Sequence, residues 1–102
     1  MIMVGAAAEL EVLTRFGEAV ESPEKLAQQA ALAEANGFPH GVSVMALKDL
    51  TKPGSRALRS EVEKFFRVRN TGTNPLHRTI ELPKPVTKEI ADQFNRLFGR
   101  TR

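Results

Sequence analysis

The sequence predicts an α+β domain, in which N-terminal helices pack on a small antiparallel β-sheet and an amphipathic helix ends the chain. Apolar residues recur with helical spacing near both ends, whereas the middle of the chain alternates apolar and polar residues as strands do. A turn-forming segment, NTGTNP at residues 70–75, separates two of the alternating runs. With 102 residues, the chain has the length of one compact domain with a single core.

Residues 1–36 are predicted to form a helical hairpin that serves as a packing or entry module. Ser22 supplies an N-cap and Pro23 the first helical position, so two helices are expected to meet there. Asn36 and Gly37 end the second helix. The apolar stripe of the first helix comprises Ala6, Leu10, Leu13, Gly17 and Val20, and that of the second comprises Leu26, Ala30 and Ala33.

After Gly37 the spacing of apolar residues changes from helical to alternating. HGVSVMAL at residues 40–47 is therefore predicted to form a strand, with His40 at its start. The segment LTKPGS breaks the chain, and Ser55 is predicted to cap a helix that reaches about Lys64. The end of that helix is ambiguous, because FFRVRN also alternates. We assign a strand to residues 66–69. The apolar face of the helix would hold Leu58, Val62, Phe65 and Phe66.

Residues 77–82 form the second alternating run and are expected to pair with residues 66–69 as an antiparallel hairpin. Pro83 and Pro85 end this strand. Thr87 then caps a final helix, and Gly99 stops it. Its apolar face comprises Ile90, Ala91, Phe94, Leu97 and Phe98.

Composition limits the classes of function. The chain contains no cysteine, which excludes disulfides, thiolate nucleophiles and sulfur-rich zinc sites. A net charge of +3 allows an anionic partner but is low for a dedicated nucleic-acid coat. No apolar stretch approaches the roughly 20 residues that span a bilayer, and the N-terminus lacks the basic region of a signal peptide. If the domain is exported, we expect the export information to lie outside this chain.

Alternation along HRTIELP sorts the side chains of the second hairpin strand onto two faces. Ile80 and Leu82 are predicted to face the core, while His77, Thr79 and Glu81 lie on the opposite face. In FFRVRN the same rule buries Phe66 and Val68 and turns Arg67 and Arg69 outward. If the strands pair as proposed, an imidazole, a hydroxyl and two guanidiniums share one sheet face.

Such a set of groups suits cleavage of phosphate esters. Metal-free RNA cleavage needs a base for the 2′-hydroxyl, an acid for the leaving 5′-oxygen and cations for the phosphoryl oxygens. Histidine titrates near neutrality, and arginine binds phosphate oxygens in pairs. His77 is therefore the first catalytic candidate, with Thr79 as a hydrogen-bond donor. Arg67 and Arg69 are candidate phosphate ligands, and either His40 or Lys48 is a candidate for the second proton transfer.

A structural interpretation stands beside the catalytic one. A histidine at a strand entrance is commonly a surface or turn residue, and outward arginines on a sheet are commonly solvated. The two histidines form no zinc motif, and the chain has no acidic calcium loop, glycine-rich phosphate loop or dinucleotide fingerprint. Ser43 lies in GVSV, which lacks the G-x-S-x-G turn of hydrolases. We expect no metal and no cofactor.

Two segments carry a resemblance to a known class of protein. GFPHGVSVMA, followed by FFRVRNTGTNPLHRTIELPKPVTKEIADQFNRLFGR, resembles the C-terminal toxin domains of bacterial polymorphic-toxin and contact-dependent growth-inhibition proteins. The likeness covers residues 37–100. Within it, His77 and Thr79 match an H-x-T element, and His40 and Ser43 match an H-G-V-S element. Arg67 and Arg69 match only in position.

The resemblance implies a nuclease core over residues 37–102, similar to the barnase, colicin-nuclease and EndoU-like group. It implies delivery from the cell surface as the end of a larger secreted protein, action in the cytoplasm of a target cell, and neutralisation by a cognate immunity protein. By analogy, transfer RNA is a possible substrate. Whether a host factor activates the domain is left open.

One departure and two rival functions accompany this hypothesis. Arg78 stands where the family often has an aromatic residue, and alternation directs it toward the Ile80 face. Either that face is partly exposed, or the strand phase slips by one residue. The main rival is a non-enzymatic binding module that uses the same basic face for RNA or a protein. A toxin of different chemistry is the other.

Overall fold

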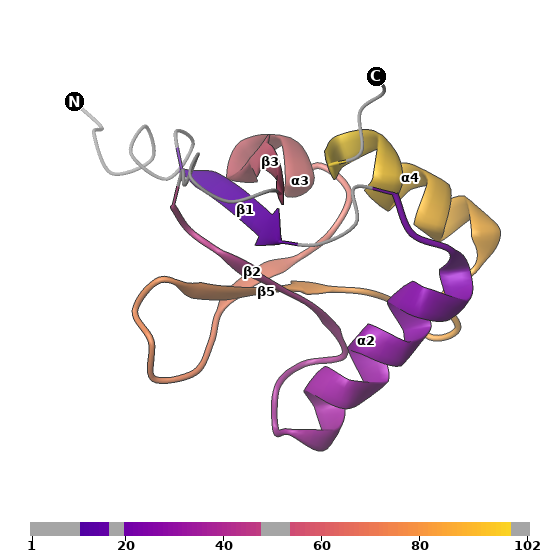
Figure 1. The fold of residues 1–102 in the computed structure, drawn as a ribbon, viewed down its shortest axis with the longest axis horizontal. Helices are drawn as coiled ribbons and strands as arrows, with labels where there is room; N and C mark the ends of the chain where they lie inside the picture. The colour runs from indigo at the N-terminus through magenta and orange to yellow at the C-terminus, as the bar shows by residue number, and fades with distance from the viewer. Residues whose placement is uncertain (1–10, 17–19, 48–53, 99–102) are drawn as a thin grey trace.

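The computed structural model describes residues 11–16, 20–47 and 54–98. In this part of the chain, five strands form one antiparallel sheet in the order β3-β1-β2-β5-β4 (Figure 1). The elements are, in chain order, β1 (Val12–Phe16), α2 (Pro23–Ala35), β2 (Gly41–Met45), β3 (Gly54–Leu58), α3 (Arg59–Val62), β4 (Val68–Asn70), β5 (His77–Glu81) and α4 (Lys88–Phe98). The α+β fold class and the C-terminal helix are confirmed.

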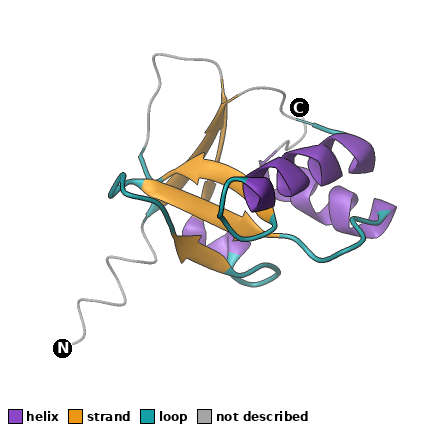
Figure 2. Ribbon diagram, turned by 90° about the horizontal axis from the view of Figure 1, so that it is seen from below, coloured by secondary structure: helices purple, strands orange, loops and turns teal. Residues whose placement is uncertain are grey.

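The core lies between one face of the sheet and the two longer helices, α2 and α4, which gather on one side of it (Figure 2). Val42, Ile80 and Val68 pair across β2, β5 and β4 and are buried on this face. Phe94 of α4 belongs to the same core cluster and has no exposed surface. Burial of this apolar surface is the main source of stability for a domain without disulfides.

Both long helices begin as the sequence predicts. The Oγ of Ser22 accepts a hydrogen bond from the backbone N–H of Lys25 at 3.1 Å, and Pro23 occupies the first turn of α2. After α2, Gly37 adopts a φ of +89°, the left-handed conformation that ends many helices. In α4, the hydroxyl of Thr87 accepts a bond from the N–H of Ile90 at 3.2 Å.

The N-terminal helical hairpin is wrong in its first half, because Val12–Phe16 form strand β1. The rest of the predicted first helix, residues 1–10 and 17–19, lies outside the described residues. Leu13 and Arg15 face the core, and the guanidinium of Arg15 forms a 2.7 Å ion pair with Glu21 above the ring of Phe94. A charged residue at an inward position hid the alternation that would have indicated a strand.

The helix predicted to begin at Ser55 is also wrong, because Gly54–Leu58 form β3. This strand pairs with β1 residue by residue, from Val12 opposite Leu58 to Phe16 opposite Gly54. The helix α3 begins only at Arg59 and ends at Val62. Strand β1 lies some 40 residues before β3 in the sequence. The hydrogen bonds between these two strands override the helical spacing of the local sequence.

The predicted hairpin is confirmed, with shifted bounds for its first strand. β4 and β5 pair antiparallel, with Val68 opposite Ile80 and Arg69 opposite Thr79. Phe66 and Val68 are buried, whereas Arg67 and Arg69 are exposed, as alternation required. The strand phase therefore has no slip.

Arg78 lies on the core side of the sheet, where an ion pair with Glu11 compensates its charge. Its guanidinium donates to Glu11 at 2.9 Å and to the carbonyl oxygen of Pro75 at 2.7 Å. Arg59 donates to the same carboxylate at 2.8 Å. Partial burial acts to raise the pKa of Glu11, but the hydrogen bonds and charges of Arg78 and Arg59 together lower it below its ordinary value. This carboxylate connects the start of β1 with α3 and β5.

Candidate active site on the polar sheet face

The sheet face opposite the helices carries the polar candidates, and we call it the polar face. It is defined by Ser43, Arg69, His77, Thr79 and Glu81. Ser43, Thr79 and Arg69 are register partners across β2, β5 and β4, so they form one row. Two residues toward the start of β5, His77 lies opposite Met45. Because side chains alternate along each strand, all five project to the same side.

A chain of hydroxyls supports the imidazole of His77. Its Nδ1 lies 2.8 Å from the hydroxyl of Thr71, which in turn lies 2.8 Å from the hydroxyl of Thr79. Thr79 has no exposed surface. When Nδ1 donates to Thr71 and Thr71 donates to Thr79, Nε2 is the ring nitrogen left to exchange a proton. That arrangement serves both the neutral and the charged ring, because Nδ1 keeps its proton in each.

Phe38 holds the ring from the other side. The two ring centroids are 5.1 Å apart, with an angle of 34° between the planes. Gly72 adopts a φ of +75°, and a Cβ at that position would lie 3.3 Å from the Phe38 ring. The left-handed conformation of this turn between β4 and β5 therefore favours glycine, and a larger residue would also press on the Phe38 ring.

His77 is half-buried and borders a hollow of about 200 Å³ that is also lined by Phe16, Ser43, Val44 and Met45. A second hollow, of about 250 Å³, is lined by Gln29, Leu32, Ala33, Asn36, Phe38 and Ser43. Both hollows include Ser43, which is exposed. The imidazole is thus neither sealed in the core nor isolated from space that a ligand can enter.

The predicted arginines share the polar face but do not converge on His77. The guanidinium of Arg69 forms an ion pair with Glu81, on the side of Thr79 away from the imidazole. Arg67 is exposed, and its carbonyl oxygen accepts a bond from the N–H of Glu81 at 2.9 Å. Positive charge on this face is therefore centred near Glu81, four positions along β5 from His77.

The structure does not bring His40 to His77. His40 precedes Gly41, which pairs with Glu81, while His77 pairs with Met45 at the opposite end of β2. His40 is five residue steps from Met45 along the chain, or about 16 Å at the rise of a strand. The Nδ1 of His40 lies 2.9 Å from the carbonyl oxygen of Leu82, so it carries a proton and donates there. Lys48, the other predicted partner, lies outside the described residues.

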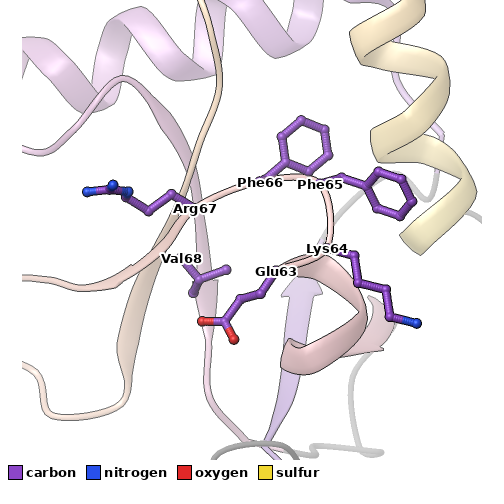
Figure 3. A pocket seen from close by; sticks show the side chains of 6 residues that line it. All are labelled: Glu63, Lys64, Phe65, Phe66, Arg67 and Val68. Atoms are coloured by element: carbon purple, nitrogen blue, oxygen red, sulfur yellow. The ribbon is translucent and has the colours of Figure 1, made fainter.

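A larger hollow, of about 420 Å³, lies at the bend between α3 and β4 (Figure 3). Its lining runs from Glu63 to Val68 along one continuous segment. Figure 3 shows Lys64 and Arg67 pointing in opposite directions from the bend. The two cations therefore do not form one anion site there.

Sequence reasoning missed the two residues that hold the imidazole of His77. Thr71 continues the alternation of Arg67 and Arg69 by one more step, so extending the strand pattern into the turn would have found it. Phe38 precedes β2 and reaches His77 only through the fold, and no local signal marks it.

The part of the chain that the structure describes has no group of three or more acidic or histidine side chains placed to share a metal ion. Within the described ranges, each helix is too short or too polar to cross a bilayer.

Comparison with family models, with curated proteins and with solved structures found no match for this chain.

Proposed function

We propose that the chain is a toxin-type ribonuclease domain that cleaves RNA on the polar face without a metal ion. The observation that carries this proposal is the imidazole of His77, bordered by an open hollow and tied through Nδ1 to the Thr71 and Thr79 hydroxyls. A fixed Nδ1 leaves Nε2 to transfer a proton to or from a substrate.

The scissile phosphate would lie over the exposed Ser43, between His77 and Glu81. Among the described residues of the polar face, Glu81 is the second side chain that can accept and release a proton. Its carboxylate would remove the proton of the 2′-hydroxyl, while the imidazolium of His77 would protonate the leaving 5′-oxygen. The four residue steps from His77 to Glu81 span about 13 Å along the backbone, so both side chains would have to lean toward each other to reach the attacking and leaving oxygens of one phosphate.

Arg69 and Arg67 supply the positive charge in this mechanism. The phosphate takes the place of Glu81 as the partner of Arg69, which frees the carboxylate to act as a base. Guanidinium groups then stabilise the charge that grows on the phosphoryl oxygens during the displacement. Both arginines are exposed, so a substrate can reach them without a change in the fold.

The likeness to secreted toxins supports the biological setting of the proposal. Such a domain is delivered into a neighbouring bacterium and acts on RNA, with transfer RNA as the first substrate to examine. In the producing cell an immunity protein blocks it, and an acidic surface on that protein would match the exposed arginines.

Inducible expression in bacteria, followed by gel analysis of total RNA, tests the proposal. Wild-type protein is expected to arrest growth and degrade RNA, and purified protein should cleave RNA equally well in EDTA. His77→Ala should abolish cleavage. Lys25→Ala removes an exposed cation from α2 and is the matched control. Growth arrest with intact RNA would reject a ribonuclease in favour of another toxin chemistry.

A binding module that holds RNA without cleaving it is the second candidate. The observation that favours it is the direction of Arg69, whose guanidinium contacts Glu81 rather than the imidazole. This candidate predicts salt-dependent RNA binding that Arg67→Ala weakens and His77→Ala leaves unchanged, with no cleavage product. Product formation that depends on His77 would exclude it.

A further inference from the structure

We propose that the hollow between α2 and β2 binds one nucleobase of the RNA and prefers a base that carries an exocyclic amino group. The inference rests on the proposed ribonuclease and adds a specificity site to it. The hollow of about 250 Å³ is smaller than the roughly 300–1,000 Å³ of sites for drug-sized ligands. Its size suits a single planar ring system.

The hollow lies where the end of α2 meets the start of β2. Thr14 and Met45 are the one register pair of β1 and β2 among the described residues, and β1 ends at Phe16, which lines the neighbouring hollow together with Ser43. Helix α2 packs along β2, with Ala33 buried and Leu32 exposed. Where α2 ends at Ala35, Asn36 and Phe38 complete the wall.

The hollow adjoins the proposed reaction centre through two shared residues. Phe38 lines the hollow and also contacts the ring of His77. Ser43 lines the hollow and is the register partner of Thr79. A nucleotide whose base enters the hollow therefore has its sugar and phosphate directed across Ser43, over the residues that would perform the cleavage.

The polar atoms around the hollow favour one kind of base. The Nδ2 of Asn36 donates to the carbonyl of Leu32 at 3.0 Å, and the Nε2 of Gln29 donates to the carboxylate of Glu21. These bonds assign the amide orientations, because a carbonyl and a carboxylate only accept. The remaining amide oxygens, Oδ1 and Oε1, receive no hydrogen bond from the described residues.

Asn36 and Gln29 both line the hollow, and their amide oxygens would accept hydrogen bonds from the amino groups of adenine, cytosine and guanine. Uracil carries no such group, and its two carbonyl oxygens would meet the amide oxygens unfavourably. The exposed hydroxyl of Ser43 can donate or accept, so it does not change this preference. The side chains of Phe38 and Leu32 offer apolar contact to the flat face of a base.

NMR titration of the full chain with nucleotide monophosphates tests the inference directly. We expect AMP and CMP to shift the amide signals of Ala33, Phe38 and Ser43 and to bind about fivefold more tightly than UMP. Ribose 5-phosphate should bind most weakly. Asn36→Ala should remove the preference over UMP, whereas Gln28→Ala, which removes an exposed amide of α2 outside the hollow, should preserve it.

Equal affinity for UMP and AMP, or shifts confined to the hollow of residues 63–68, would overturn the inference. A parallel RNA cleavage assay separates it from the proposed function. Selective nucleotide binding without cleavage supports the base site and rejects the ribonuclease. Cleavage at all bases alike, with no shift at Ala33 or Phe38, keeps the ribonuclease and rejects the base site.

Discussion

Replacing Glu11 by glutamine is expected to destabilise the fold by about 3 kcal/mol. The carboxylate accepts hydrogen bonds from Arg78 at 2.9 Å and from Arg59 at 2.8 Å, and the side chain of Arg78 is only 9% exposed. Removing one partner of a buried ion pair costs about 3–5 kcal/mol, because it leaves an uncompensated charge. Glu11 is 20% exposed, so water screens part of the effect and the lower end of that range applies.

Urea unfolding followed by far-UV circular dichroism measures the change. The chain contains no tryptophan and no tyrosine, so intrinsic fluorescence is a poor probe. With a slope of about 1.5 kcal/mol per molar urea, the midpoint of Glu11→Gln should fall by roughly 2 M at pH 7. Glu61→Gln is the control, because its 3.3 Å pair with Lys64 is exposed on both sides and contributes less than about 1 kcal/mol. Equal midpoints for the two variants would refute the reasoning.

The same carboxylate gives stability a dependence on pH. Its folded pKa is lower than its ordinary value of 4.5, so the unfolded chain binds more protons in the acid range. Its contribution is therefore fully present above the ordinary pKa and is lost as pH falls through the lowered, folded pKa. Between neutral pH and this acid range, wild type should lose more stability than Glu11→Gln, which lacks the titrating group. A parallel loss in both proteins would contradict this assignment.

Three further predictions concern packing and the site. Gly41→Ala should lower the free energy of unfolding by at least about 2 kcal/mol in urea titrations, because the new Cβ would lie 2.0 Å from a backbone oxygen of β5. If the variant were as stable as the wild type, β2 and β5 would have to separate freely at this position. Phe94→Ala should lower the free energy of unfolding by about 3–5 kcal/mol in the same measurement, whereas Phe65→Ala, at a side chain 55% exposed, should lower it far less. Similar losses of stability in the two variants would disprove the assignment of the core. If the proposed ribonuclease is correct, Thr71→Val should reduce kcat about tenfold with little change in KM and should change the ¹⁵N chemical shifts of the His77 ring, because the imidazole loses its oriented partner. An unchanged kcat would remove the Thr71–Thr79 hydroxyl chain from the mechanism.

Local sequence patterns predicted the elements whose signals lie within a few residues. Ser22 and Gly37 mark the two ends of α2, and Thr87 marks the start of α4. Alternation placed Val68 and Arg69 on opposite faces of β4, and the structure agrees. Such signals survive in the fold, because capping and alternation depend on near neighbours in the chain.

The candidate site was predictable only in part. Alternation placed His77, Thr79 and Arg69 on one face, which the register confirms. It gave no information on the direction of the Arg69 side chain, which pairs with Glu81. A long side chain chooses among several charged neighbours, and that choice depends on the positions of all of them.

The sequence by itself determined the α+β class, α2, α4 and the β4–β5 hairpin, because each depends on residues close together in the chain. Only the tertiary structure decided that β1 and β3 are strands, that Glu11 neutralises Arg78, and that His40 lies at the far end of β2 from His77. Strand pairing and ion pairing join segments far apart in sequence. Their free energy arises only after the chain has closed the loop between them, so no local pattern records it.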